Sequence, residues 1–239
     1  MNGKKMKEGQ TMGFTEESQT FLVAAYYREL KETFGERGIE AFVHAVKQYG
    51  MQRGSRMAQR AIRDGQKLDY ITFCRYGEWE PSEEIVAAGK VSKTQIAGYT
   101  PDYELHVLTC PWYRGFEKFD SEAGALYCAN LDEAINQGFN GRIPFRTVQT
   151  MHTADCCIFR VLDAGITPET DLRHRSGTVR GFDYHCADVY VAFATVSAGV
   201  FGQQGQDLAA RVLERFGQQY GEEMAQKLQQ LAGENFRIA

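Results

Sequence analysis

The feature that most constrains the fold is a repeat that links the two ends of the chain. The segments "FGERGIEAFVHAVKQYGMQRGSRMAQ", from Phe34, and "FGQQGQDLAARVLERFGQQYGEEMAQ", from Phe201, match without a gap at a constant offset of 167 residues. Four glycines keep this register, which unrelated amphipathic helices would seldom do, so the pattern indicates a duplicated helical unit. Each copy predicts a helix, a break at Phe-Gly and a longer helix. The positions in register are Phe34/Phe201, Gly35/Gly202, Gly38/Gly205, Gly50/Gly217, Gly54/Gly221 and the Met-Ala-Gln triplets 57–59/224–226.

Two of these glycines in each copy predict close packing of helices. Gly50 and Gly54 are four residues apart and share one helix face, as do Gly217 and Gly221. Glycine inside a helix costs about 1 kcal/mol relative to alanine, which favours a compensating close contact. The partner of this face, the other repeat or a second subunit, stays open.

The sequence between the two copies is typical of strands. Four segments are rich in β-branched and aromatic residues and predict an antiparallel sheet: 69–77, 103–112, 143–150 and 155–163. One helix interrupts them at 121–140, "SEAGALYCANLDEAINQGFN", with Ser121 as the candidate N-cap and Gly138 as the candidate stop. We therefore expect an α+β fold, a central antiparallel sheet with one inserted helix, flanked by duplicated N- and C-terminal helical units.

The 239 residues are expected to form a single α+β domain, long enough to bury a core without disulfide or metal staples. We divide it into a helical repeat unit at 15–65, a sheet and site region at 66–165, a loop at 166–184 and a second helical repeat unit at 185–233. The loop is Gly-rich and polar, and is a candidate cover for a site.

Charge and hydropathy narrow the possible partners. Acidic residues outnumber basic ones by 31 to 27 and no long Lys/Arg block occurs, which argues against a nucleic-acid partner. The first 14 residues lack the apolar stretch of a secretory signal, and the longest apolar run, 189–201, is shorter than the ~20 residues that span a bilayer. We expect a cytoplasmic protein with a small-molecule substrate and no membrane partner. Assembly into a homo-oligomer stays open.

The six cysteines contain no C-x-x-C pair, and in the cytoplasm we expect most of them to be thiols. Two of them belong to "TMHTADCCIFR" at 150–160. If this stretch is a strand, alternation places Asp155 on the same face as Cys157, where a buried carboxylate needs partners or a raised pKa. Alternatively, Asp155 caps a tight turn between two strands and His152 is exposed on it. Both interpretations stay open.

A second candidate pair lies on the inserted helix. Cys128 and Asp132 are four apart and share a face beside the apolar stripe of Tyr127, Leu131 and Ile135. A carboxylate raises the pKa of a neighbouring thiol unless a base or a cation intervenes.

His152 or His185 would be that base, and Cys110, at a strand end, is expected to converge on the same place. These residues indicate either a thiol/carboxylate catalytic pocket or a zinc site with mixed ligands. The intervals of 18 and 29 residues between Cys110, Cys128 and Cys157 differ from zinc-finger spacing. The catalytic pocket is therefore the first interpretation and the zinc site the second.

The order "TCPW…GALYCANLDEA…GFN…TADCCIFR" resembles the family of L-2-amino-thiazoline-4-carboxylic acid hydrolases. In that family a Cys-Pro precedes a Cys-x-x-x-Asp helix and a strand with a small residue, Asp, Cys and Phe. Cys110, Cys128, Asp132 and Cys157 fall on the recurring positions. The family usually has Gly where this chain has Thr153, and a variable residue where it has Cys156.

The resemblance implies hydrolytic opening of a small ring, of the kind found among bacterial metabolites, without an organic cofactor or a metal. A cyclic amidine, a thiazoline or a lactam would be the substrate. The expected catalytic residues are Cys128, Asp132, Cys157, Asp155 and His152. The expected substrate contacts are Cys110, Trp112 and His185.

The cysteine and acid pattern is also similar to 4-vinyl-reductase-type ligand-binding domains, in which cysteines and a carboxylate hold a structural zinc beside an apolar pocket. The alternative function is therefore a zinc-containing small-molecule-binding module. Zinc would be its cofactor.

Overall fold

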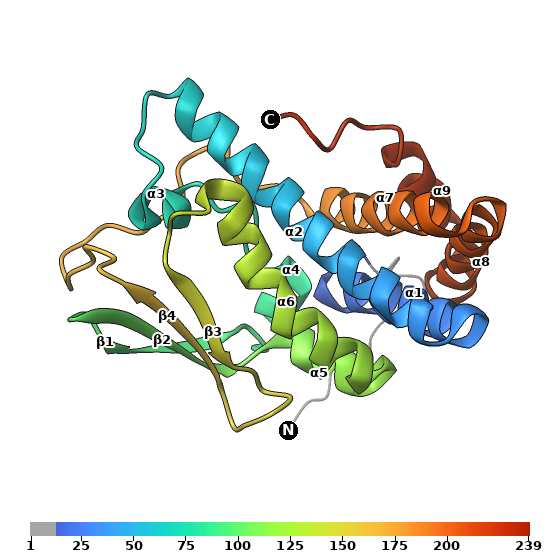
Figure 1. Cartoon of the computed structure of the whole chain (residues 1–239), viewed down its shortest axis with the longest axis horizontal. Coiled ribbons are helices and arrows are strands. Elements are labelled where there is room, and N and C mark those ends of the chain that lie inside the picture. Colours follow the sequence, from blue (N-terminus) through green and yellow to red (C-terminus); the bar gives the residue numbers. More distant parts are fainter. Residues whose placement is uncertain (1–12) are drawn as a thin grey trace.

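The two predicted helical units lie side by side in the computed structural model, which describes residues 13–239 (Figure 1). The first unit consists of α1 (Glu16–Phe34) and α2 (Glu36–Arg63), and the second of α7 (Phe182–Phe201), α8 (Gln203–Tyr220) and α9 (Glu222–Leu231). Their buried side chains form the main hydrophobic core together with the inserted helix.

Equivalent residues of the two copies adopt the same local structure and meet each other. Gly35 and Gly202 share φ of 59° and ψ of −133°, a conformation that L side chains rarely adopt. The rings of Phe34 and Phe201 stack with centroids 3.6 Å apart and planes 1° from parallel. Each of these phenylalanines therefore packs against its own equivalent in the other copy. The predicted helix, Phe-Gly break and following helix occur in both copies, but the longer second helix is found only in the first copy, since α8 has 18 residues and α7 has 20.

The copies differ at their last glycine. Gly54 continues within α2, where a Cβ atom would lie 2.0 Å from the carbonyl oxygen of Ile135. Gly221, with φ of 97°, ends α8, and a Cβ there would meet nothing within 4 Å. Close packing is therefore confirmed for Gly54 and wrong for Gly221. The partner of α2 is the inserted helix α6 (Ser121–Asn140), neither the other repeat nor a subunit.

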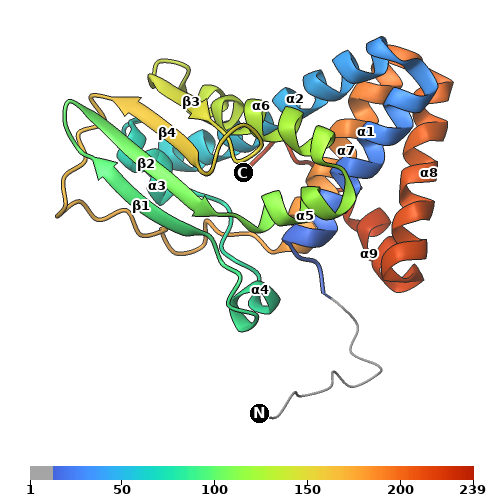
Figure 2. The ribbon, with the colours of Figure 1, turned by 90° about the horizontal axis from the view of Figure 1, so that it is seen from below.

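The sheet lies on the far side of α2 and α6 from the second helical unit (Figures 1 and 2). Its strands are β1 (Lys93–Gly98), β2 (Asp102–Thr109), β3 (Phe145–Gln149) and β4 (Cys157–Leu162). Their order is β1-β2-β4-β3, and all neighbours are antiparallel. The α+β class is thus confirmed.

One predicted strand is wrong and one strand was missed. Residues 69–77 contain the helix α3 (Tyr70–Arg75), because the Asp69 side chain accepts a hydrogen bond from the Thr72 N–H at 2.9 Å and caps its first turn. Strand β1 was missed because it is an exposed edge strand with no buried residue, so it lacks an apolar alternation. A second short helix, α4 (Glu83–Ala87), precedes it.

The inserted helix has the predicted bounds but different end signals. Asp120, not Ser121, is the N-cap, and its carboxylate accepts the Ala123 N–H at 3.0 Å. Gly138 does not stop the helix. A Cβ there would lie 2.2 Å from the Met51 carbonyl oxygen, so Gly138 is a second point of close approach between α6 and α2.

The predicted loop is shorter than expected and does not cover the cavity described below. Helix α7 begins at Phe182, and the preceding segment packs along the chain that follows α3. There the Arg180 N–H donates to the Glu78 carbonyl at 2.7 Å and the Arg175 N–H to the Arg75 carbonyl at 2.8 Å.

No helix within residues 13–239 is both long enough and apolar enough to cross a bilayer. Residues 1–12, which include most of the segment searched for a secretory signal, lie outside the described part of the chain.

Candidate active site

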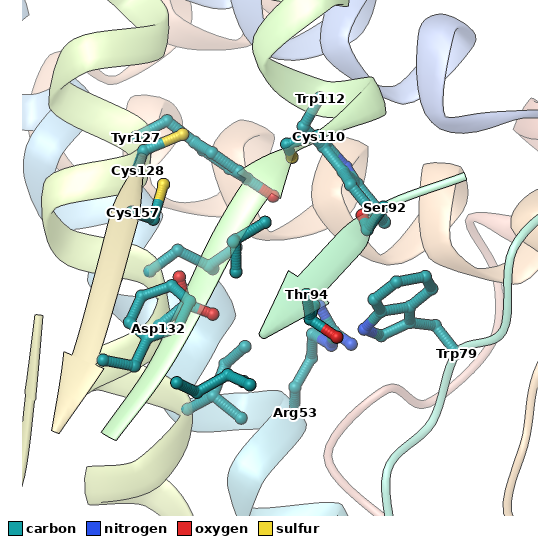
Figure 3. Close-up of a pocket in the computed structure, with 15 residues that line it drawn as sticks. Arg53, Trp79, Ser92, Thr94, Cys110, Trp112, Tyr127, Cys128, Asp132 and Cys157 are labelled. Atoms are coloured by element: carbon teal, nitrogen blue, oxygen red, sulfur yellow. The ribbon is translucent and has the colours of Figure 1, made fainter. Parts of the chain in front are cut away.

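A cavity of about 290 Å³ lies between α6 and the inner face of β2 and β4 (Figure 3). The pairs Leu105/Phe159 and Val107/Cys157, opposite each other in the sheet, form one wall. The other wall is α6, whose apolar stripe of Tyr127, Leu131 and Ile135 lies next to Cys128 and Asp132. The one-turn spacing of these side chains explains why all five face the same space. The cavity is mostly apolar with a few polar groups, as small-molecule sites are.

Asp132 is the carboxyl group of this cavity. Its removal from water raises its pKa to about 6, which the nearby Arg53 guanidinium opposes only in part. At pH 7 a carboxyl group with this pKa is about nine-tenths ionised, and it is far more basic than an exposed aspartate.

Three thiols from three different elements line the same cavity. Cys128 comes from α6, Cys157 from β4, and Cys110 is the N-cap of α5 (Pro111–Phe119). Cys157 Sγ accepts the Met151 N–H at 3.3 Å. Burial raises the pKa of Cys157 to about 11, that of Cys128 well above its usual value, and that of Cys110 as well. The thiols are therefore protonated near pH 7.

Arg53 brings positive charge to the cavity from α2. It is buried, it lies over the Tyr49 ring, and its Nε has no hydrogen-bond partner within residues 13–239. Its Nε lies 3.7 Å from Glu78 Oε2, at the edge of a buried ionic network. The network joins three guanidinium groups to two carboxyl groups, so positive charge is in excess beside the cavity. Its members are Arg53, Arg56, Arg60, Glu78 and Asp188.

Two tryptophans form an aromatic part of the lining. Trp79 and Trp112 meet edge to face with ring centroids 4.7 Å apart. The Trp112 indole N–H donates to Gln19 Oε1 at 2.8 Å, and Gln19 Nε2 in turn donates to the Tyr49 hydroxyl at 2.9 Å. These bonds fix the orientation of the Trp112 ring against the helical core.

The structure brings together five of the eight predicted site residues and separates the other three. Those that line the cavity are Cys110, Trp112, Cys128, Asp132 and Cys157. Asp155 is exposed in the β3–β4 turn, because β4 begins only at Cys157. The strand interpretation of Asp155 is therefore wrong, and its place in the turn is confirmed.

Neither histidine lines the cavity. His152 is half-buried rather than exposed, and packs against the Tyr113 ring with centroids 5.0 Å apart. His185 is buried in α7, where its Nε2 lies 3.0 Å from the Glu78 carbonyl oxygen, and burial lowers its pKa to about 3. The expectation that one of them activates a cavity thiol is not supported by this placement.

Sequence patterns missed the arginine, one tryptophan and two hydroxyl groups of the lining. These are Arg53, Trp79, Ser92 and Thr94. A signal for Arg53 existed, since it lies between Gly50 and Gly54 on the face that packs against another helix. Thr94 belongs to β1, the edge strand that the sequence did not predict, and Ser92 directly precedes it.

The thiols and the carboxyl group share a cavity without forming a metal site. Within residues 13–239 no three His, Cys, Asp or Glu side chains are arranged so that they could hold a metal ion.

A comparison with protein families matches residues 14–161 to L-2-amino-thiazoline-4-carboxylic acid hydrolase. The match contains every residue that lines the cavity and ends before α7. No curated protein and no solved structure matched the chain.

Proposed function

Because the chain belongs to the L-2-amino-thiazoline-4-carboxylic acid hydrolase family, we propose that it opens a small ring by adding water in the cavity between α6 and the sheet. The substrate would be a cyclic amidine, a thiazoline or a lactam, and the reaction needs no organic cofactor. The volume of about 290 Å³ suits a molecule of this size.

The observation that carries this proposal is the half-buried carboxyl group of Asp132, which lines the cavity. Its pKa of about 6 lies close to physiological pH, so the group is mostly ionised and still accepts a proton readily. A strongly perturbed acid in a small apolar cavity is typical of catalytic sites.

The charges of the cavity support an amidine that also carries an acid group. A protonated cyclic amidine would pair with the Asp132 carboxylate. A carboxylate substituent on the ring would pair with the Arg53 guanidinium, which lines the cavity. Opposite charges on two walls would hold the ring in one orientation between them.

In the proposed reaction the amidine-like carbon gains an oxygen atom from water and loses its bond to one ring heteroatom. Asp132 takes the proton released as the new carbon–oxygen bond becomes a carbonyl, and delivers a proton to the departing heteroatom. The bound cation also favours ionisation of the neighbouring thiols, a role that the sequence had led us to expect of a histidine.

A substrate screen tests this function. Purified protein would be assayed with cyclic amidines, thiazolines and lactams, each with and without a carboxylate, in the presence of a chelator. We expect turnover of at least one carboxylated ring, and a loss of 100-fold or more in Asp132→Asn, as removal of a general base typically gives. In Arg53→Gln we expect KM to rise for carboxylated rings only.

Two results would contradict the proposal. One is the absence of turnover for every ring class, and the other is undiminished activity in Asp132→Asn. Protein purified without added zinc that contains one zinc per chain, and binds rings without opening them, would instead support the binding-module alternative.

A further inference from the structure

We propose, on the basis of the hydrolase function above, that Cys110 is the nucleophile of the reaction and bonds covalently to the ring carbon. The sequence had placed Cys110 among the substrate contacts and the nucleophile at Cys128 or Cys157. The place of Cys110 at the start of α5 and the Tyr127 hydroxyl on the same side of the cavity favour it over both.

Cys110 lies at the N-terminus of α5, where backbone N–H groups are free. The first hydrogen bond of the helix runs from the Arg114 N–H to the Cys110 carbonyl at 3.2 Å. Pro111 has no N–H, so the first free donors of the helix are the N–H groups of Trp112 and Tyr113, and neither makes a side-chain cap hydrogen bond to Cys110 in this structure. Both lower the pKa of the Cys110 thiol, against the larger effect of burial, which raises it. Helix N-termini stabilise thiolates in this way.

A second group points into the cavity toward Cys110. Tyr127 is 2 % exposed, and its hydroxyl has no hydrogen-bond partner within the described residues. Figure 3 shows this hydroxyl directed across the cavity to the side where Cys110 lies. A buried hydroxyl without a partner costs free energy, and a ligand or a reacting group in the cavity would offset that cost. We propose that this hydroxyl donates a hydrogen bond to an atom attached to the attacked carbon, where negative charge develops during the reaction.

The other two cavity thiols have poorer surroundings for a thiolate. Cys128 lies in the middle of α6, where backbone N–H groups are used within the helix, and the nearby Cys110 and Asp132 raise its pKa further beyond the effect of burial. Cys157 accepts one N–H, from Met151, and its pKa is about 11. We therefore expect both to contact the ring without bonding to it.

The covalent step balances without an oxidant or a reductant. The Cys110 thiol gives its proton to Asp132, and the thiolate forms a carbon–sulfur bond to the amidine carbon. The bond from that carbon to the ring heteroatom breaks, and the heteroatom takes the proton from Asp132. Water then adds to the same carbon, the bond to Cys110 breaks, and the thiol is regenerated.

The proposed order of steps predicts a covalent intermediate that mass spectrometry can detect. The departing heteroatom stays tethered to the carbon skeleton, so ring opening releases nothing from the enzyme. The intermediate should therefore add the full mass of the substrate to the peptide that contains Cys110.

The test is an acid quench during turnover, followed by peptide mapping. We expect the adduct on Cys110 in the wild type and none in Cys110→Ser. Serine is a preferred N-cap, so Cys110→Ser should fold normally while losing 1000-fold or more of kcat. Cys128→Ser and Cys157→Ser should keep the adduct, with losses below 100-fold, and Cys74→Ser, in α3 outside the cavity, serves as the matched control.

The other possible outcomes contradict different parts of the proposal. Turnover with an adduct on Cys128 or Cys157, or with full activity in Cys110→Ser, would reject Cys110 as the nucleophile and leave the hydrolase function intact. Turnover with no adduct in any quench and only a small loss in Cys110→Ser would favour direct attack by water. Absence of turnover in the wild type would reject the hydrolase function itself.

Discussion

At the scale of single residues, the unfavourable burial of Asp132 is what suits it to act as a base. An exposed aspartate is almost fully ionised at pH 7 but binds a proton too weakly to help the reaction. Transfer to the cavity between α6 and the sheet raises its pKa from 3.8 to about 6. The same shift affects both the rate of the reaction and the stability of the fold.

The first prediction concerns the pH profile. Because the ionised form of Asp132 accepts the proton, kcat/KM should fall about tenfold for each pH unit below roughly 6 and level off above it. Steady-state kinetics between pH 4.5 and about 8 would show this limb. A profile that stays flat through pH 6 would remove Asp132 from proton transfer.

The second prediction concerns stability. The folded protein holds a proton on Asp132 more tightly than the unfolded chain does, so this residue lowers stability as the pH rises from about 4 to about 6. A shift of roughly two pKa units corresponds to at most about 3 kcal/mol. Asp132→Asn should therefore be more stable than the wild type by on the order of 1–3 kcal/mol at pH 7.5, with little difference at pH 4. Urea denaturation at both pH values would measure this, and a less stable variant at pH 7.5 would contradict it.

At the scale of elements, the distance between α2 and α6 determines where the cavity walls lie. Glycines on both helices permit this approach, since Cβ atoms at Gly54 and Gly138 would lie 2.0 and 2.2 Å from backbone oxygens of the other helix. The same contact brings Arg53, next to Gly54, to the edge of the cavity that α6 lines. Backbone atoms cannot yield as a flexible side chain does, so a methyl group there has to move a whole helix.

The third prediction compares two glycines in helices. Gly54→Ala should destabilise the protein by about 2 kcal/mol or more through overpacking, and should weaken substrate binding by displacing Arg53. Gly199→Ala in α7 is the matched control, because a Cβ there meets nothing within 4 Å, and it should be neutral or stabilising by up to about 1 kcal/mol. Thermal denaturation of both variants would measure this difference in stability. Equal melting temperatures would mean that α2 and α6 do not depend on this contact.

At the scale of the whole molecule, a buried ionic network joins the two helical units to the segment that leads to the sheet. Arg56 of α2 bonds Glu78 at 2.8 Å and Asp188 of α7 at 2.7 Å, and it also donates to the Phe236 carbonyl near the C-terminal end. Burial opposes ionisation of Glu78, but the hydrogen bonds and charge of Arg56 hold its pKa at about 2. Removal of one partner leaves charges buried without compensation.

The fourth prediction follows from that network. Glu78→Gln should cost about 3–5 kcal/mol near pH 7, and Glu80→Gln, which changes an exposed side chain two residues away, should cost less than about 0.5 kcal/mol. Because the folded pKa of Glu78 is depressed, its contribution is fully present above about pH 4.5 and is lost as the pH falls toward 2. Chemical denaturation of both variants from pH 7 to about 3 would measure this. Equal stability of the two variants would show that the network contributes little.

The sequence by itself determined the duplication, the α+β class and the composition of the α6 wall. Each depends on local rules: glycines in register, alternation along a strand, and one-turn spacing that puts Cys128 and Asp132 beside Tyr127. Local rules also failed in places, since Asp69 capped a helix where a strand was expected and the exposed β1 had no apolar pattern to recognise.

Only the tertiary structure decided which groups share the cavity. Arg53 comes from α2 and Cys110 from the start of α5, and their approach to Asp132 depends on how close α2 and α6 can pack, a contact between residues far apart in the sequence. The same packing buries His185 beside Glu78 and leaves Asp155 in the exposed β3–β4 turn. The ionisation of Asp132 and of the three thiols depends on burial, and burial is a property of the assembled elements rather than of any one segment.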